Sequence, residues 1–249
     1  MADNFQNKYH LATTVNQLQA QKLSQQVFIG PLNTLAQHQF ISTNNIRYVI
    51  GILPCHKCCY YLKDFEPNQF TCINVDPDFN VQRLTEFEGE CLMRFNTKFT
   101  PNLEVLTDHK INNSIVTNLD IQKILQEFIL IMNCIKQKDP QAGVLLFSLN
   151  GNDNLLSLFT CAYVQDSLNC DSSSAYGYLK SIRPSIKEIE RGSGYANELL
   201  KFEINNKAKK LQLENSQNTI RVKSKRSVTD CDDHLEVEME YPRSFKRSF

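Results

Sequence analysis

The sequence predicts an α/β fold in which a central sheet is flanked by helices. Residues 27–29, closed by Gly30-Pro31, and residues 48–54 are short apolar runs that end on turn signals, as buried strands do. Residues 144–147 are apolar without interruption, which is typical of a central strand covered on both faces. Helical patterns separate these runs, and alternation of strands with helices indicates a layered α/β architecture.

The helices are predicted from apolar residues that recur every three or four positions. One helix falls between the first two strands, a long one precedes the third strand, and another opens after the loop that follows it. Two more are expected from Ser172 to Arg183 and near residues 195–202, so the compact domain should stop near Glu203. The positions that define the first three helices are Leu32, Leu35, Ala36 and Phe40; Ile121, Ile124, Leu125, Phe128, Ile129 and Met132; and Leu155, Leu158, Phe159 and Ala162.

The stretch 55–101 is interpreted as an insertion. It contains one predicted strand, 70–75, and a short predicted helix, 81–87. A further strand is predicted at 103–106, ending at Thr107-Asp108.

Composition divides the 249-residue chain into three parts. Residues 1–25 form a Gln/Asn-rich arm, residues 26–205 the folded domain, and residues 206–249 a charged tail. Ile220 and Val222 alternate with basic residues, and residues 235–241 alternate apolar with acidic ones. A solvated, mobile tail is the favoured interpretation. The period of two gives two alternatives: the pieces pair as a charged hairpin, or the acidic piece adds as a strand to a partner's sheet edge.

Charge and hydropathy exclude several classes of partner. The 27 Lys and Arg residues balance 27 Asp and Glu residues, so no net field attracts nucleic acid or an anionic membrane. No apolar run approaches the ~18 residues that a membrane span needs. No signal peptide opens the sequence, and the nine cysteines lack an even framework. We therefore expect a soluble intracellular protein in the cytoplasm; the basic cluster at 223–226 suggests the nucleus as an alternative.

Cys55, Cys58 and Cys59, with Cys72 further on, include a CxxC spacing that zinc accepts. No second CxxC or HxxxH pair follows at zinc-finger spacing. Ordinary free cysteines at a strand end are the favoured interpretation, with a metal site as the alternative. No cofactor is expected.

Several short motifs occur in the order in which they occur in dual-specificity protein phosphatases of the protein tyrosine phosphatase superfamily. The resemblance covers residues 26–204 and implies that family's fold. It rests on Val27-Phe28-Ile29-Gly30-Pro31, residues 46–53, the loop after Val144, Ile182-Arg183-Pro184 and residues 199–203.

The resemblance also shows which catalytic positions have changed. In that family the central strand ends in His-Cys, and a Gly, an Arg and a Ser follow at fixed spacing; the Cys thiolate attacks phosphorus and the Arg binds phosphate oxygens. Here the His position is Phe147, the nucleophile position is Ser148, Gly151 is retained, the Arg position is Asn154 and the Ser position is Leu155. The chain thus resembles a catalytically inactive member, of a fungal type.

The chemistry of these residues supports the loss of activity. Ser148 supplies no thiolate, and Asn154 offers neutral donors where a charged fork would bind about twice as strongly. Asp153 adds a carboxylate that repels phosphate. We expect Phe147, Ser148 and Leu155 to serve packing; the alternative is that Ser148 and Gly151 still hold a phosphorylated residue. Replacement of Leu146 by Asp is expected to unfold the protein, whereas replacement of Asn152 is not.

The family's general acid, an Asp before the long helix, matches Asp108. The motif Ile73-Asn74-Val75-Asp76-Pro77-Asp78 resembles the same acid loop. Without a nucleophile, a turn or cap residue is the favoured interpretation of either Asp.

The sequence therefore predicts a pseudophosphatase with no catalytic residues. It is expected to act as an adaptor or regulatory protein that binds phosphoproteins, kinases or phosphatases in phosphorylation-dependent signalling, without nucleic-acid or membrane partners. The alternatives are a phosphatase with an unorthodox nucleophile and a protein that binds phosphorylated residues without hydrolysing them.

Overall fold

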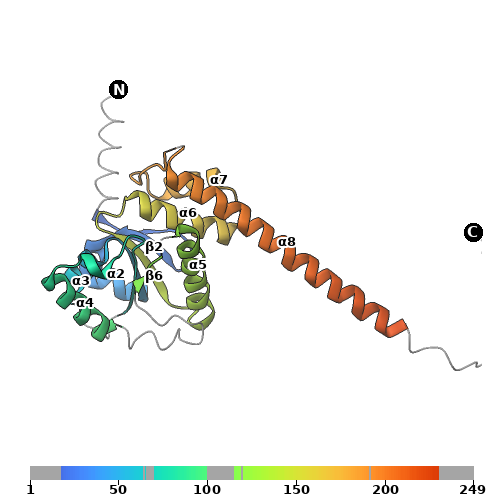
Figure 1. Cartoon of the computed structure of the whole chain (residues 1–249), viewed down its shortest axis with the longest axis horizontal. Helices are drawn as coiled ribbons and strands as arrows, with labels where there is room; N and C mark the ends of the chain where they lie inside the picture. The colour runs from blue at the N-terminus through green and yellow to red at the C-terminus, as the bar shows by residue number, and fades with distance from the viewer. Residues whose placement is uncertain are drawn as a thin grey trace, which may run out of the picture. The chain divides into compact units, whose positions relative to one another are not determined.

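The computed structural model of the chain describes residues 18–63, 65, 70–99, 115–118, 120–190 and 192–229 (Figure 1). The chain divides into two units, 1–205 and 206–249. Within the described ranges, no helix combines the length and the apolar composition that would let it cross a membrane.

A six-stranded sheet forms the centre of the first unit. Its strand order is β1-β2-β6-β3-β4-β5, and only the β1–β2 pair is antiparallel. A parallel sheet is covered by helices on both faces, so its strands are apolar throughout. The predicted central strand is confirmed, since all six residues of β6 are buried. The strands are β1 Gln21–Lys22, β2 Val27–Pro31, β3 Ile46–Ile52, β4 Thr71–Val75, β5 Ile115–Val116 and β6 Gly143–Ser148.

Two hydrophobic clusters fill the two faces of this sheet, and successive strand residues alternate between them. Leu146 packs in the cluster beneath α5, α6 and α7, whereas Leu145 and Phe147 pack in the cluster beneath α3 and α4. Figure 1 shows α3 and α4 on one side of β2 and β6 and α5 on the other. The predicted α/β fold, a central sheet flanked by helices, is therefore confirmed. The helices are η1 Leu32–Ala36, α2 His38–Thr43, α3 Cys55–Leu62, η2 Val81–Arg83, α4 Glu86–Phe99, α5 Ile121–Lys138, α6 Asn154–Leu168, α7 Ser172–Ile182 and α8 Gly194–Thr229.

The long predicted helix, α5, forms as its apolar stripe requires. Asp120 caps it, because a carboxylate oxygen accepts the Gln122 amide at 2.9 Å. Phe128 is fully buried, and its ring meets that of Phe159 on α6 edge to face, with centroids 5.2 Å apart. The stripe thus joins α5 to α6 on one face of the sheet.

The segment that we interpreted as an insertion supplies α3, β4 and α4, and β4 pairs in parallel with β3. It is therefore part of the central sheet, connected through α3 as a parallel pair requires. Cysteines that we expected at a strand end lie on α3 instead, where Cys55, Cys58, Cys59 and Leu62 repeat at helical spacing and are buried. The four cysteines are free, as expected, but three of them supply the apolar face of α3 rather than the end of a strand.

The predicted helix at 81–87 is also displaced. A short 3-10 turn, η2, occupies residues 81–83, and α4 begins at Glu86. The side chains of Thr85 and Glu88 cap α4 reciprocally: the Thr85 amide donates to Glu88 at 2.8 Å and the Glu88 amide to Thr85 at 3.3 Å. The strand predicted at 103–106 lies outside the described residues.

The tail departs from its predicted period of two. Ile220 and Val222 lie within α8, so the strand predicted for this part of the tail is wrong. Two alternating residues are a short pattern, and a helix already begun at Gly194 extends by one backbone hydrogen bond per residue. The acidic piece at 235–241 lies outside the described residues.

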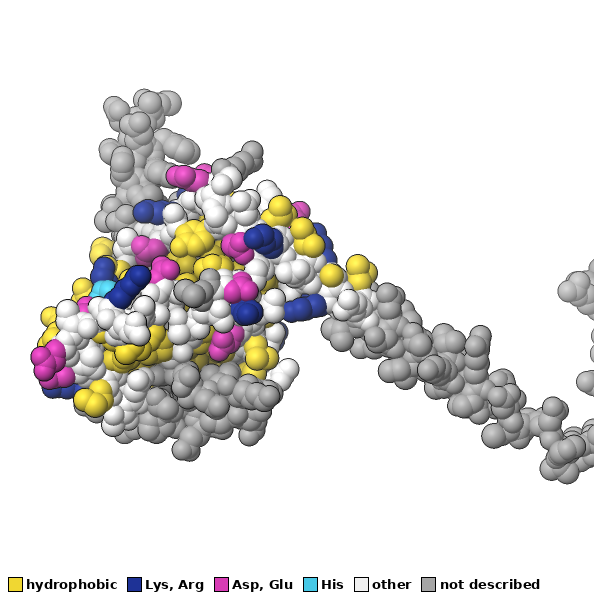
Figure 2. Space-filling view, in the orientation of Figure 1, with side chains coloured by type: hydrophobic (Ala, Val, Ile, Leu, Met, Phe, Trp, Pro, Cys, Tyr) yellow, Lys and Arg dark blue, Asp and Glu magenta, His cyan; other side chains and the backbone are white. Residues whose placement is uncertain are grey.

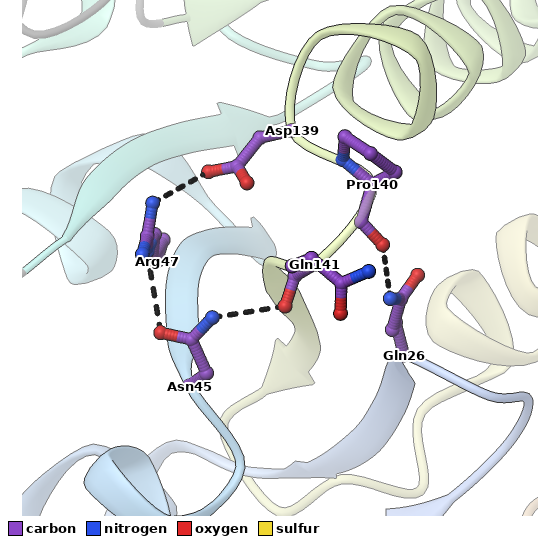
Figure 3. A network of polar contacts seen from close by, with 6 residues as sticks. All are labelled: Gln26, Asn45, Arg47, Asp139, Pro140 and Gln141. Atoms are coloured by element: carbon purple, nitrogen blue, oxygen red, sulfur yellow. Dashed lines mark hydrogen bonds and ion pairs between the residues drawn. The ribbon is translucent and has the colours of Figure 1, made fainter.

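Polar contacts fix the amino ends of the central strands (Figure 3). Arg47 on β3 donates to the Asp139 carboxylate at 3.0 Å, and the side-chain amide of Asn45 donates to the Gln141 carbonyl at 2.9 Å. Gln26, just before β2, donates to the Pro140 carbonyl. The connection from α5 to β6 is thus held by residues from two neighbouring strands.

Candidate functional site

The loop that follows β6 is the candidate site. It lies at the carboxyl end of the central strand, between Ser148 and Asn154, the first residue of α6. The strand, the loop and the helix occur where the sequence predicts them. Ligands of open parallel sheets bind at this edge, and the amino end of a helix favours anions there.

Ser148, which the resemblance places at the nucleophile position, is fully buried. Its hydroxyl oxygen accepts the Gly151 amide at 3.1 Å. In an anion-binding loop, backbone amides face the ligand. Here the Gly151 amide is instead occupied by the Ser148 hydroxyl. The packing interpretation is incomplete for Ser148, because its hydroxyl also closes the loop.

Phe147, at the position of the family's His, packs as an ordinary strand residue. Its register partners are Gly30 on β2 and Gly51 on β3. A Cβ atom at Gly51 would lie 2.8 Å from the Phe147 ring, so the glycine makes room for the aromatic side chain. Leu155 likewise packs against the cluster on the other face of the sheet. Both contacts support the packing role expected for these two residues.

Gly151 holds the tightest point of the loop. Its φ of +73° lies in the left-handed region. A Cβ atom there would come within 2.7 Å of the Gly30 carbonyl carbon and of the Pro31 nitrogen. The positive φ and the close approach of Gly30 and Pro31 therefore favour glycine at position 151, whatever the loop binds.

Arg183 is the residue of this site that sequence reasoning missed. It is fully buried, and its Nε donates to the Gly151 carbonyl at 2.6 Å and to the Asn152 side-chain oxygen at 2.9 Å. Its Nη1 donates to the Gln19 carbonyl at 3.0 Å and to the Gln21 side chain. Desolvation lowers the pKa of Arg183 to about 10, which leaves it charged at neutral pH. The segment Ile182-Arg183-Pro184, one of the motifs of the resemblance, contains this arginine, but the motif assigns it no role.

Asn152 links this arginine to the chain that follows it. Its side-chain oxygen also accepts from Ser185 at 3.0 Å, and its carbonyl accepts the Lys187 amide at 3.2 Å. Only 6 % of the residue is exposed. The expectation that this position tolerates replacement therefore needs revision.

Asn154, which the resemblance places at the arginine position, is exposed, and Asp153 beside it is the N-cap residue of α6. The Asp153 carboxylate does not cap α6. Asn154 lines a cavity of about 590 Å³, together with Asp120, Glu198 and Lys201.

Acidic groups outnumber basic ones in the lining of this cavity. Glu198 and Lys201 form an ion pair at 2.7 Å, and the hydrogen bond from Lys201, followed by that from Gln122, keeps the pKa of Glu198 below its ordinary value. The side chain of Gln122 donates to Glu198 at 2.7 Å. With Asp120 as a second carboxylate in the lining, the cavity is unfavourable for a phosphate dianion.

The two candidates for the former general acid have different outcomes. Asp108 lies outside the described residues. Asp76 directly follows β4, and its carboxylate accepts the Cys55 amide at 2.7 Å and the Asp78 amide at 3.1 Å. It therefore caps α3, as a turn or cap residue would. Desolvation raises the pKa of Asp76 above its ordinary value.

The four cysteines Cys55, Cys58, Cys59 and Cys72 are buried together, and the sulfurs of Cys55 and Cys59 lie 3.7 Å apart. A hydrogen bond with Cys59, followed by burial, raises the pKa of Cys55; a hydrogen bond with Cys72 does the same for Cys58. Protonated thiols are poor nucleophiles. In the described ranges, no group of three or more His, Cys, Asp or Glu residues is placed to hold a metal ion.

The family model described as "YAL037W N-terminal domain" matches residues 18–151, more than half of the 249-residue chain. No curated protein sequence matches the chain.

Solved structures with a similar fold are dual-specificity phosphatase-like members of the protein tyrosine phosphatase superfamily. A leucine rich repeat and phosphatase domain containing protein from Entamoeba histolytica has a TM-score of 0.48 and 15% identity, over 77% of this chain and 95% of that chain. Human DUSP28 has a TM-score of 0.43 and 11% identity, over 75% of this chain and 93% of that chain. A human tyrosine phosphatase-like serine/threonine/tyrosine-interacting protein has a TM-score of 0.44 and 14% identity, over 74% of this chain and 95% of that chain.

Proposed function

The chain belongs to the family of the YAL037W N-terminal domain, and from this premise we propose that it is a phosphatase-like protein that binds other proteins without hydrolysing phosphate esters. The partners that we propose are intracellular proteins of phosphorylation-dependent signalling: phosphoproteins, kinases or phosphatases. In this role the protein is an adaptor or a regulatory subunit.

The observation that carries the proposal is the state of the nucleophile position. Ser148 is fully buried, and its hydroxyl is engaged by the Gly151 amide. A serine needs a neighbouring base to attack, and none of the hydrogen bonds that Ser148 makes within the described residues involves one. Attack on phosphorus would require the loop to open.

Charge around the loop supports the same proposal. Asn154, which the resemblance places at the arginine position of dual-specificity phosphatases, cannot form charge-assisted bonds to phosphate. The cavity beside Asn154 is lined by two carboxylates and one lysine that is already paired. A phosphate dianion would meet repulsion without a charged clamp to offset it.

The face visible in Figure 2 offers no single-signed field either. Figure 2 shows basic and acidic side chains interspersed on the visible face, consistent with 27 residues of each sign in the whole chain. Partner binding should then depend on local shape and local charge rather than on long-range attraction.

One observation favours a second candidate, a protein that holds a phosphorylated residue without cleaving it. Asp153 leaves the first amides of α6 without a side-chain cap, and such amides attract anions. Arg183 below the loop also remains charged. Binding of inorganic phosphate separates this candidate from the first.

The test is hydrolysis of an aryl phosphate together with binding of phosphate, vanadate and tungstate. We expect neither activity nor appreciable anion binding. Binding without turnover would favour the second candidate, and turnover that Ser148→Ala abolishes would overturn the proposal in favour of an unorthodox phosphatase.

A variant in which the phosphatase residues are restored provides the complementary experiment. Phe147→His, Ser148→Cys and Asn154→Arg, combined with Asp153→Asn, restore the family's groups together. Because such groups act as a unit, each single repair should restore almost nothing. Weak turnover by the combined variant would show that the loop backbone still fits phosphate. Partners are then identified by crosslinking and affinity purification from cells.

A further inference from the structure

The cavity beside Asn154 has the size of a small binding site. Its volume is about 590 Å³, within the range of roughly 300–1,000 Å³ typical of ligand pockets. Residues at the starts of three helices, α5, α6 and α8, line it, and Asn154 directly follows the loop after β6. A partner protein that docks on the candidate site therefore meets this cavity as well.

Two carboxylates line the cavity, and only one of them has a cationic partner. Glu198 is paired with Lys201 at 2.7 Å. Asp120 forms no ion pair with a described residue; one of its side-chain oxygens accepts the Gln122 amide at 2.9 Å, and no described donor reaches the other oxygen. A carboxylate offers about four acceptor sites on its two oxygens. Asp120 can therefore cap α5 and still accept hydrogen bonds from a ligand.

A third carboxylate acts on the aromatic residue of the lining. Desolvation, followed by the charge of Asp78, raises the pKa of the Tyr195 hydroxyl above its ordinary value. The field of Asp78 therefore reaches this wall of the cavity. Among the described residues, the carboxylate of Asp78 has no hydrogen-bond or ion-pair partner, since only its backbone amide is bonded. Asp78 and Asp120 thus give the surroundings of Tyr195 an excess of negative charge.

The helix starts have the opposite effect, because the amino end of a helix attracts anions. The Asp120 carboxylate offsets the start of α5, and the Ser193 hydroxyl accepts the Ala196 amide at 3.2 Å at the start of α8. Asp153 provides no such cap for α6. Even counted in full, three partial charges of about +0.5 do not exceed the charge of the two carboxylates that lack an ionic partner. The balance favours a cation.

The remaining lining suits a guanidinium group on an apolar stem. Tyr195 contributes an aromatic ring, on which a planar guanidinium can stack. Ile121 is half-buried and offers apolar surface to methylene groups. The side-chain oxygen of Gln122 is buried and has no hydrogen-bond donor among the described residues. An acceptor without a donor in the cavity wall favours a ligand that donates several hydrogen bonds.

We propose that this cavity binds an arginine side chain from a basic segment of a partner protein. The guanidinium hydrogen-bonds to the Asp120 carboxylate and lies against the Tyr195 ring, while its methylene stem lies on Ile121. A lysine is the poorer occupant, because its ammonium is a point charge without a planar fork. The inference rests on the proposed function and deepens it, since it gives one chemical feature of the protein partner.

The test compares N-acetyl-arginine amide with N-acetyl-citrulline amide, which have nearly the same shape and differ in charge. Amide resonances of the ¹⁵N-labelled full chain are followed by NMR during titration with each compound. We expect the arginine derivative to shift the resonances of Gln122, Asn154 and Tyr195 in a saturable way. The citrulline derivative should bind at least about fivefold more weakly, because hydrogen bonds between charged groups are the stronger ones.

Three results would overturn the proposal. They are equal affinity for the two derivatives, no saturable shift at these residues, and tighter binding of inorganic phosphate than of the arginine derivative at the same residues. The last result would mean that the helix starts, rather than the carboxylates, decide the charge of the ligand.

A charge-removing variant assigns the binding to Asp120. Asp120→Asn keeps the cap of α5, because asparagine caps helices as well as aspartate does. We expect this variant to bind the arginine derivative about fivefold more weakly, at the level of the citrulline derivative. Glu86→Gln removes an exposed carboxylate from α4, on the other face of the sheet, and should leave the affinity unchanged. Equal affinities of the two variants would contradict the role of Asp120.

Failure of this test is distinct from failure of the proposed function. If the arginine derivative does not bind, the proposed function still stands, because a protein partner can use another surface. Hydrolysis of an aryl phosphate by the unmodified protein would overturn the proposed function, whatever the cavity binds.

Discussion

The Nε atom of Arg183 donates to the carbonyl oxygen of Gly151 at 2.6 Å, across 32 positions of the chain. The same atom reaches Asn152, and the other end of the guanidinium reaches Gln19 and Gln21. All four acceptors are neutral. A buried cation thus organises the loop, the edge strand β1 and the turn after α7 around one point.

We expect Arg183→Met to lower the free energy of unfolding by about 2–4 kcal/mol, because several buried acceptors lose their donor at once. The measurement is urea unfolding at neutral pH. Arg47→Met is the matched control: the Arg47 side chain is 58% exposed, and its ion pair with Asp139 should contribute at most about 1 kcal/mol. Equal losses in the two variants would show that Arg183 does not organise the loop.

Asn152→Ala should also destabilise the protein, by about 1–3 kcal/mol, because the Ser185 hydroxyl loses its acceptor and the Arg183 Nε loses one of its two. Asn197→Ala, at an exposed position of α8, should change the stability by no more than about 0.5 kcal/mol. Both values come from the same urea titration. Tolerance of Asn152→Ala would restore the expectation drawn from the sequence.

Gly151→Ala tests the backbone of the loop. We expect a loss of about 1–3 kcal/mol, since φ is +73° and the added methyl group meets the backbone of Gly30 and Pro31 at 2.7 Å. Gly89→Ala on α4 meets nothing within 4 Å and should stabilise the protein by up to about 1 kcal/mol. Opposite signs in thermal unfolding are the expected result; a loss in both variants would contradict the strain assigned to Gly151.

Leu146→Asp should prevent folding, because the charge would enter a fully buried strand and cost about 4 kcal/mol or more. Leu149→Asp, three residues later, replaces a side chain that is 42% exposed, and the variant should fold. Circular dichroism and solubility distinguish the two. A folded Leu146→Asp protein would mean that β6 is not the centre of the sheet.

Asp76 predicts a dependence of stability on pH. Desolvation raises its pKa in the folded state above the ordinary value of 3.8, so between these two values the folded state binds more protons than the unfolded state. Its contribution to stability therefore falls as pH rises through that window and stays low above it. Relative to Asp76→Asn, the unmodified protein should lose stability over this range.

The measurement for Asp76 is urea unfolding at a series of pH values from about 3 upward. Asp153→Asn removes a partly exposed carboxylate instead and corrects for the change in net charge. A stability difference between the unmodified protein and Asp76→Asn that does not change with pH would contradict the assignment of this titration to Asp76.

The sequence by itself determined the features that depend on local pattern or on residue identity. The run at 144–147 predicts a central strand, and the stripe from Ile121 to Met132 predicts a helix, because side-chain burial follows the period of each element. The identities of Ser148 and Asn154 are also read directly from the chain, and their placement at catalytic positions stays a prediction from the resemblance. Local pattern failed where it was short, at Ile220 and Val222, and where cysteines supplied the apolar face of α3.

Only the tertiary structure decided which distant residues meet. Asp76 caps α3 across 21 positions, and Arg183 reaches Gln19 across 164. A cavity at the amino ends of β2 and β6 gathers residues from Ser24 to Leu168. Periodicity places a side chain on one face of its own element, whereas these contacts depend on the order in which the strands pair. That order is set by the packing of the whole domain, so no local window of the sequence contains it.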